Sequence, residues 1–301
     1  MPKRKPRKDP EDLPDAPEGK GKRKNEDSDS DEDMDMVNVD FEWFDPQPAV
    51  DFHGLKTLLR QLLDVDAQLF DLSALADLIL SQPLLGSTVK VDGNESDPYA
   101  FLTVLNLSTH KDNKVIKDLT TYLTKKASST PSLAPLSSLL SQPSPSQIGL
   151  ILTERFINMP HETVPPMYTM LLEEIAWALS EKEPYAFTHY LILSKTYAEV
   201  ASSLSSPDPP PPSKKKKGGA AGGKGKEEET FYFHPEDEVL QKYSLGWGSF
   251  EYDTEVDEGA SDSKRAFQEL GVKPKGHLVL IEGKRFEEAV NAVKEFLGSG
   301  Q

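Results

Sequence analysis

Cysteine is absent from the 301-residue sequence. Disulfides, thiolate metal ligands, iron–sulfur clusters and thiol catalysis are therefore excluded. Long apolar runs are also missing, and the first ten residues, MPKRKPRKDP, lack the apolar stretch of a secretion signal. Apolar residues make up only 37% of the chain. We therefore expect a protein of a reducing intracellular compartment, with no membrane partner and with part of its chain outside any core.

Positive charge is scarce. Lys and Arg number 34 against 50 Asp and Glu, so the net charge is 34 − 50 = −16. This balance argues against direct nucleic-acid binding, because a surface that binds nucleic acid must neutralise phosphates. It favours a basic protein as the partner.

The first 36 residues change the sign of their charge along the chain. Residues 1–24 hold nine basic residues against five acids, whereas residues 26–45 hold ten acids and no Lys or Arg. With so few apolar residues, we expect a disordered tail up to about Met36. A solubilising or phosphate-binding tail is one interpretation. The other is a two-cluster nuclear import signal, formed by Lys3, Arg4, Lys5, Arg7, Lys8, Lys20, Lys22, Arg23 and Lys24.

Two serines of the tail are candidates for phosphorylation. Ser28 and Ser30 each precede an acid by three residues, the pattern of acid-directed kinase sites. Phosphates there would add negative charge beside Asp31, Glu32 and Asp33, which we take as candidates for partner binding. An unmodified, solvated tail is the alternative.

A second acidic stretch, residues 227–262, interleaves acids with aromatic residues. It holds twelve acids and one Lys, a net charge of 1 − 12 = −11. Acids attract a basic partner over a distance, and aromatic side chains anchor it on contact. Alternatively, the aromatics are ordinary core and the acids are its rim. The partner-binding candidates here are Glu236, Asp237, Glu238, Trp247, Phe250, Tyr252, Asp253, Glu255, Asp257 and Glu258.

Apolar periodicity predicts one layered α/β domain over residues 37–298, with a mixed central sheet flanked by helices. We expect strands at 37–44, 88–92, 99–108, 148–156, 187–197 and 277–282, and a strand with or without a turn at 231–243. We expect helices after the capping residues Asp51 and Asp112, over 73–82 and 130–140, from Pro165, and over 286–297. Residues 205–229, with four consecutive prolines, four consecutive lysines and many glycines, predict a disordered insertion.

Motifs for enzyme activity are incomplete. The run GGAAGGKG at 218–225 lacks the Ser or Thr that holds magnesium in a phosphate-binding loop. His161-Glu162 begins a zinc-protease pattern, but position 165 is Pro rather than the second His. The G-x-S-x-G turn of an α/β-hydrolase does not occur. These motifs therefore assign no catalytic residue, no metal and no cofactor.

Two long motifs resemble the BCCIP family, whose fungal members are called BCP proteins. One reads VNVDFEWFDP at 37–46 and DFHGLKTLL at 51–59. The other reads LTERFINMP at 152–160 and VPPMY at 164–168. Asp97-Pro98-Tyr99 and Glu236-Asp237-Glu238 also match the family pattern. The resemblance covers about residues 37–298.

This resemblance implies a fold similar in outline to the GCN-five-related N-acetyltransferases and a non-enzymatic role in the nucleus, with shuttling to the cytoplasm. Family members are chaperones of a basic large-subunit ribosomal protein of the universal L-fourteen class. Fungal members are also linked to nuclear export of a phosphatidylinositol-phosphate kinase. The implied partners are therefore this ribosomal protein, nuclear import and export receptors, and a lipid kinase cargo.

Two alternatives to the chaperone role stay open. The first is a transport adaptor for other cargo, such as the lipid kinase. The second is a divergent enzyme with the acyltransferase fold. Against the enzyme, the nearest match to the Gly-rich loop that binds coenzyme A, at 268–273, ends in Lys and does not follow the predicted strand 187–197.

Overall fold

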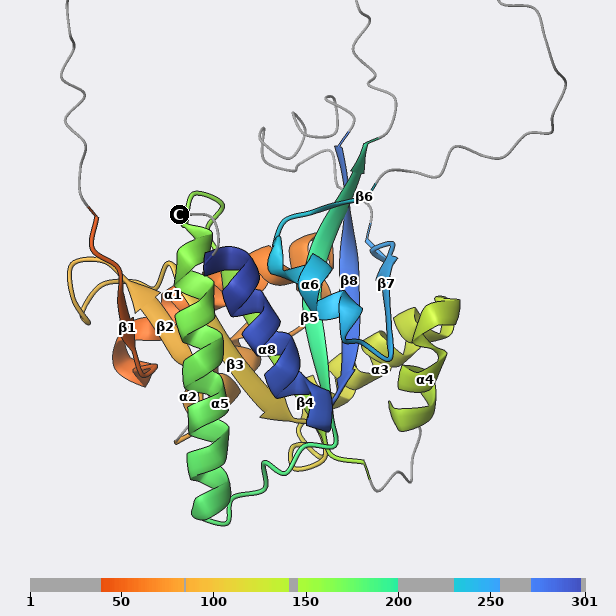
Figure 1. The fold of residues 1–301 in the computed structure, drawn as a ribbon, viewed down its shortest axis with the longest axis horizontal. Coiled ribbons are helices and arrows are strands. Elements are labelled where there is room, and N and C mark those ends of the chain that lie inside the picture. Colours follow the sequence, from red (N-terminus) through yellow and green to blue (C-terminus); the bar gives the residue numbers. More distant parts are fainter. Residues whose placement is uncertain (1–38, 84, 141–145, 200–229, 255–271, 299–301) are drawn as a thin grey trace, which may run out of the picture. The chain divides into compact units, whose positions relative to one another are not determined.

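A mixed β-sheet of eight strands organises the part of the chain that the structure describes (Figure 1). This computed structural model describes residues 39–83, 85–140, 146–199, 230–254 and 272–298. The strands lie in the order β1-β2-β3-β4-β5-β8-β7, and β6 also pairs with β5. Their bounds are β1 Glu42–Phe44, β2 Ser87–Lys90, β3 Ala100–Asn106, β4 Ile148–Arg155, β5 His189–Glu199, β6 Thr230–Tyr232, β7 Gly246–Phe250 and β8 Val272–Glu282.

Helices cover both faces of this sheet (Figure 1). One face carries α1 Pro48–Leu63, α2 Leu72–Leu80, α3 Lys114–Ser128 and α4 Ala134–Leu140. The other carries α5 Val164–Ser180, α6 Glu236–Lys242 and α8 Gly283–Gly298. Short 3-10 helices connect them: η1 Asp64–Leu69, η2 Pro131–Leu133 and η3 His161–Thr163. Within the described segments, no helix is long and apolar enough to cross a bilayer.

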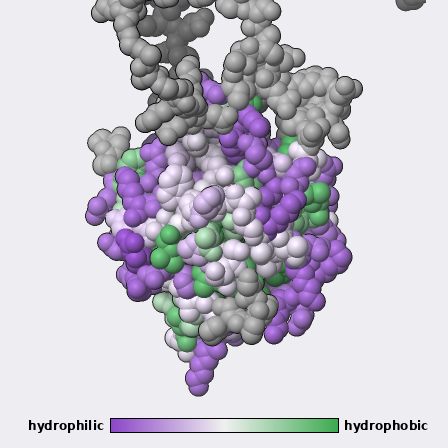
Figure 2. Space-filling view, turned by 90° about the vertical axis from the view of Figure 1, so that its right-hand side faces the viewer, coloured by the Kyte–Doolittle hydropathy of each residue, from purple (hydrophilic) through white to green (hydrophobic). Residues whose placement is uncertain are grey.

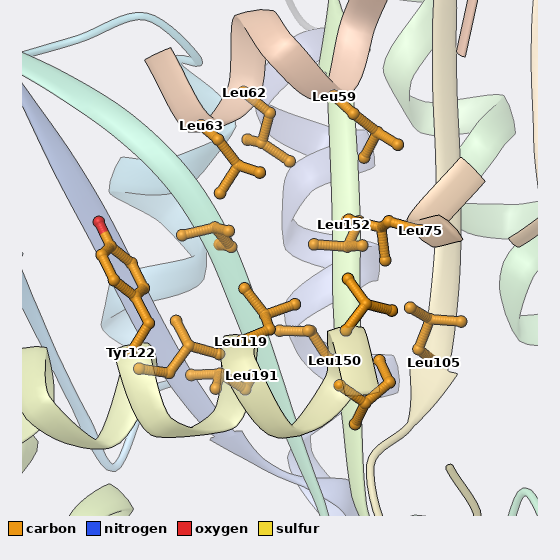
Figure 3. Close-up of a cluster of buried hydrophobic side chains, with 14 of the residues drawn as sticks. Leu59, Leu62, Leu63, Leu75, Leu105, Leu119, Tyr122, Leu150, Leu152 and Leu191 are labelled. Atoms are coloured by element: carbon orange, nitrogen blue, oxygen red, sulfur yellow. The ribbon is translucent and has the colours of Figure 1, made fainter. Parts of the chain in front are cut away.

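The alternation of side chains along the strands creates two separate cores. Leu150 and Leu152 of β4 belong to the core under α1 to α4, whereas Ile151 belongs to the core under α5, α6 and α8. Figure 3 shows the first core, in which side chains from the helices meet those of the strands: Leu59, Leu62, Leu63, Leu75, Leu105, Leu119, Tyr122, Leu150, Leu152 and Leu191. Each fully buried Leu contributes about 1.5–3 kcal/mol relative to an exposed one.

The central strand β5 pairs with different strands along its length. From β1 to β4 all pairs are antiparallel. β4 then runs parallel to β5, with α5 as the crossover between them, and their pairing ends at Leu152 and Leu193. Beyond this point β6 pairs with the same edge of β5, from Thr196 opposite Tyr232. β4 and β5 therefore separate at one end of the sheet.

The predicted α/β domain with a mixed sheet flanked by helices is confirmed, but several local predictions are wrong. Asp51 does not cap α1, which begins after Gln47 at Pro48; α3 is capped by Asn113 rather than Asp112. The segment 231–243, predicted as a strand with or without a turn, begins in β6 but continues into α6, and β7 was not predicted. A short helix and a glycine-rich strand carry little periodicity, which explains both errors. The tail 1–36, the insertion 205–229 and most of the loop 268–273 lie outside the described residues.

Candidate partner-binding surface

Two of the acids predicted to bind a partner are buried. Glu236 and Asp237, at the start of α6, are only 1% and 2% exposed. Both carboxylate oxygens of Glu236 accept from Arg155, at 2.5 and 3.1 Å. Asp237 Oδ2 accepts from Ser194 Oγ at 2.5 Å. The sequence prediction is wrong for both residues, because their carboxylates bind groups inside the fold.

The remaining described candidates of this stretch divide by exposure and pairing. Phe250 is 5% exposed and contacts Tyr122 edge to face, so its assignment as a partner contact is also wrong. Asp253 is exposed, but Lys125 and Lys126 lie 2.7 and 2.9 Å from its carboxylate. The hydrogen bonds from these two lysines lower the pKa of Asp253. Three candidates keep some exposure: Glu238 and Trp247 are exposed, and Tyr252 is half-buried.

The sheet edge that carries Trp247 is covered. Ser132 of η2 donates its hydroxyl to the Trp247 carbonyl at 2.5 Å, and a Cβ at Gly246 would lie 2.1 Å from the Ser132 carbonyl oxygen. Figure 2 shows this side of the molecule, where apolar residues form small separate groups among hydrophilic ones. This edge therefore offers no broad apolar surface. Candidates Asp31, Glu32, Asp33, Glu255, Asp257 and Glu258, the import signal and Ser28 and Ser30 lie outside the described residues.

A buried polar network fills the space where β4 and β5 separate. Lys195 Nζ lies 2.6 Å from Glu154 Oε2, and Glu154 Oε1 lies 3.1 Å from His234 Nε2. His234 Nδ1 in turn lies 3.1 Å from Ser194 Oγ. Ser, His and Glu are the residue types of a hydrolytic triad. However, Ser194 is 1% exposed and its hydroxyl donates to Asp237, so this serine meets no substrate in this arrangement.

Charges in this network shift one another's pKa values. Burial opposes ionisation of Glu154, but the hydrogen bonds and charges of His234 and Lys195 lower its pKa to about 2. Burial also lowers the pKa of His234, and Glu154 more than offsets this, so the net direction is upward. Burial and the neighbouring Glu236 raise the pKa of Asp237 to about 7. The network joins β4, β5 and α6 through buried hydrogen bonds between charged and polar groups.

No metal site emerges from the described residues. His161 Nε2 lies 3.7 Å from Glu162 Oε1 in an exposed pair. Across the ranges that the structure describes, no group of three or more His, Asp or Glu side chains could hold an ion.

Unpaired acids gather instead at the opposite edge of the sheet, along β1 and the loop 91–98 that joins β2 to β3. We call these six exposed residues the acidic edge: Asp40, Glu42, Asp45, Asp92, Glu95 and Asp97. β1 and the loop are neighbours, since Glu42 pairs with Lys90, the last residue of β2. In the described part of the chain, none of the six forms an ion pair.

One acid of this edge, Asp45, helps to shift the pKa of Glu174 in α5. Burial raises the pKa of Glu174, and the charges of Asp45 and Glu173 raise it further. Hydrogen bonds from the Gly86 N–H at 2.8 Å and the Ser87 hydroxyl at 3.2 Å act in the other direction and do not cancel the rise. Like charges thus repel one another here, and a basic partner would relieve that repulsion.

The loop of the acidic edge has a defined shape. Lys90 Nζ lies 2.6 Å from Asp51 Oδ1 and donates to the Asn94 carbonyl and side-chain oxygens at 2.7 and 2.9 Å. Asp92 and Gly93 turn the chain with φ of 63° and 88°. Ser96 Oγ closes the loop by donating to the Val91 carbonyl at 2.6 Å. The buried Lys90 therefore fixes the loop that carries the exposed acids Asp92, Glu95 and Asp97.

An apolar surface lies beside this loop. We call Tyr99, Phe156 and Ile157 the apolar centre. The Tyr99 and Phe156 rings pack edge to face with centroids 5.8 Å apart, and the Phe156 N–H donates to the Tyr99 carbonyl at 3.0 Å. Ile157 is 84% exposed, more than any other large hydrophobic residue that the structure describes. Asp97 precedes Tyr99 by two residues, and Ile157 directly follows Phe156, so the acidic loop and the apolar centre are joined through the backbone pairing of Tyr99 and Phe156.

Three of the segments that carry the family resemblance meet here. A Cβ at Gly54 of α1 would lie 2.4 Å from Pro98 Cδ, so glycine allows the helix to approach the loop. Tyr99 follows Pro98, and Phe156 belongs to the motif 152–160. These residues belong to the family motifs, but their sequence alone assigns them no site. Alternation alone does not reveal that Ile157 points outward, because it follows the end of a buried strand.

Known proteins share much of this sequence. A family model described as BCCIP matches residues 36–240. Protein bcp1 of Aspergillus fumigatus is 64% identical over 261 residues, which cover 87% of this chain and 88% of that protein. Protein bcp1 of Schizosaccharomyces pombe is 48% identical over 261 residues, covering 86% and 90%. The crystal structure of BCP1 from Saccharomyces cerevisiae matches with a TM-score of 0.59 and 26% identity, over 91% of this chain and 96% of that one. The chain therefore belongs to the BCCIP family.

Proposed function

We propose that this protein is a non-enzymatic nuclear chaperone that binds a highly basic protein through the acidic edge. The observation that carries the proposal is the contrast between the two sheet edges. Described acids near β7 are paired with lysines, as in Asp253, whereas those along β1 are exposed and unpaired. The family resemblance supplies the partner, a large-subunit ribosomal protein of the universal L-fourteen class, together with delivery to pre-ribosomes and nuclear export.

The acidic edge suits capture better than permanent attachment. An exposed ion pair contributes only about 0–1 kcal/mol, so the acids mainly raise the association rate and select the sign of the partner's charge. Ribosomal RNA, a denser polyanion, would then displace the chaperone by competing for the same basic side chains. Import by the N-terminal basic clusters completes the proposal.

Two sets of acids with equal charge provide the test. The edge variant changes Asp40, Asp45, Asp92 and Asp97 to Asn and Glu42 and Glu95 to Gln. The control variant changes Asp77 to Asn and Glu181, Glu183, Glu199, Glu287 and Glu295, all exposed, to Gln. Both bring the net charge to −16 + 6 = −10. Co-expression with the ribosomal protein is scored for soluble one-to-one complex, and its Kd is measured at low and high salt.

We expect the wild type and the control variant to keep the ribosomal protein soluble. The edge variant should bind about tenfold more weakly at low salt and show a shallower dependence of affinity on salt. Equal losses in both variants would show that net charge alone acts, and would refute the acidic edge as the site. If the ribosomal protein precipitates beside the wild type as it does alone, the chaperone proposal fails. The transport adaptor for a lipid kinase would then become the leading interpretation.

A further inference from the structure

We propose that the apolar centre anchors an apolar side chain that lies between Lys or Arg residues in the basic partner. This inference rests on the proposed function and names the chemistry of the bound segment. It begins with Ile157, whose side chain is left almost entirely in water. Burying such a side chain on binding is favourable, and interface anchors are apolar groups of this kind.

The turn that carries Ile157 separates it from other exposed apolar residues. Trp177 is 59% exposed near the end of α5, and single residues of this kind are normal on a surface. Ile157 instead stands on a fixed turn, because the Met159 N–H donates to the Phe156 carbonyl at 2.9 Å and Met159 itself is 7% exposed. The backbone that carries Ile157 is therefore already ordered before a partner binds, so binding does not have to order this turn.

Nearby charges identify the occupant. Asp92, Glu95 and Asp97 stand on the loop that leads into Tyr99, so the apolar centre adjoins one edge of fixed negative charge. A basic segment would place its Lys or Arg side chains against these acids while its apolar residue covers Ile157. The rings of Tyr99 and Phe156 add a face on which an Arg guanidinium can stack.

The same charges disfavour other occupants. A second copy of this chain, related by a two-fold axis, would bring its own acidic edge against this one. A nucleic acid would meet the same repulsion from its phosphates. The geometry therefore selects a basic protein segment with an apolar residue inside it.

Two short peptides make the test independent of the ribosomal protein. Both carry three basic residues on each side of a central position, which is Leu in one and Ser in the other. We expect the wild type to bind the Leu peptide at least about fivefold more tightly. The Ile157→Ala variant should lose this preference, while Trp177→Ala, which removes a larger exposed side chain, should keep it. Asp97→Asn should weaken both peptides equally and reduce the salt dependence.

The ribosomal protein provides the second measurement. Ile157→Ala should weaken its binding about tenfold with an unchanged salt dependence, because the lost contact carries no charge. Since Ile157 is exposed, the melting temperature of this variant should equal that of the wild type. If the wild type shows no preference for the Leu peptide, or if Ile157→Ala preserves it, the anchor is refuted. If the anchor is refuted but the wild type still binds the ribosomal protein, the chaperone proposal stands. If the wild type prefers the Leu peptide but does not bind the ribosomal protein, the chaperone proposal alone is refuted.

Discussion

The buried pair between Lys90 and Asp51 gives the sharpest stability prediction, because it holds both α1 and the acidic loop. Both side chains are 0% exposed, and their nitrogen and oxygen lie 2.6 Å apart. Changing Lys90 to Met leaves the Asp51 carboxylate buried without its cation, and the Asn94 carbonyl loses its donor. Breaking such a pair on one side costs about 3–5 kcal/mol. That is a large share of the roughly 5–15 kcal/mol by which a domain is stable.

A second substitution separates the charge from the packing. Asp51 Oδ2 accepts from the Gln47 N–H at 2.7 Å, and an Asn at this position keeps that acceptor. The double variant Lys90→Met with Asp51→Asn buries no charge, so it should recover at least about 2 kcal/mol of the loss. Urea unfolding of the wild type, both single variants and the double variant measures the four free energies. A loss below about 1 kcal/mol for Lys90→Met, or a double variant no more stable than the single one, would contradict the argument.

Two further predictions concern other parts of the sheet. Asp237 has a raised pKa of about 7 in the fold, so its contribution to stability is lost as pH rises through that value. Asp237→Asn should therefore be more stable than the wild type at about pH 8, by at most about 4 kcal/mol in the free energy of unfolding, and this difference should shrink toward about pH 4. The same pH dependence of the unfolding free energy in both proteins would speak against it. Gly246→Ala should cost about 1–3 kcal/mol because its Cβ meets the Ser132 carbonyl, whereas Gly298→Ala, with no atom within 4 Å, serves as the control. Equal melting temperatures for the two alanine variants would show that η2 moves aside.

Periodicity predicted the elements that bury one regular face. The leucines of α1 recur at helical spacing, and β4 is an apolar run bounded by Ser146 and by the turn at Asn158. Both elements were predicted close to their observed bounds. α6 and β7 carry little periodicity of their own, and their burial depends on distant residues. Arg155 draws Glu236 inward, and Ser132 approaches Gly246, and neither partner is near in sequence.

The candidate site shows the same limit. Composition predicted a basic partner but not which acids remain free to meet it. Asp253 is paired with Lys125, which lies more than a hundred positions away in the sequence. The apolar centre is formed only when Tyr99 and Phe156 are brought together by neighbouring strands. A sequence pattern records neither pairing, because each depends on the sheet order.

The position of β5 also sets an order of events during synthesis. β1 to β4 and their helices precede β5 in the chain, whereas the long pairing of β5 with β8 joins Glu199 to Val272. The ribosome must therefore add 272 − 199 = 73 residues before this pairing can begin. At a synthesis rate of about 5–20 residues per second, β5 spends several seconds with the backbone N–H and C=O groups of one edge unpaired. A nascent chain of this protein thus presents a ready-made template for strand addition before its own sheet is complete, so this member of the BCCIP family would itself need protection while it is being made.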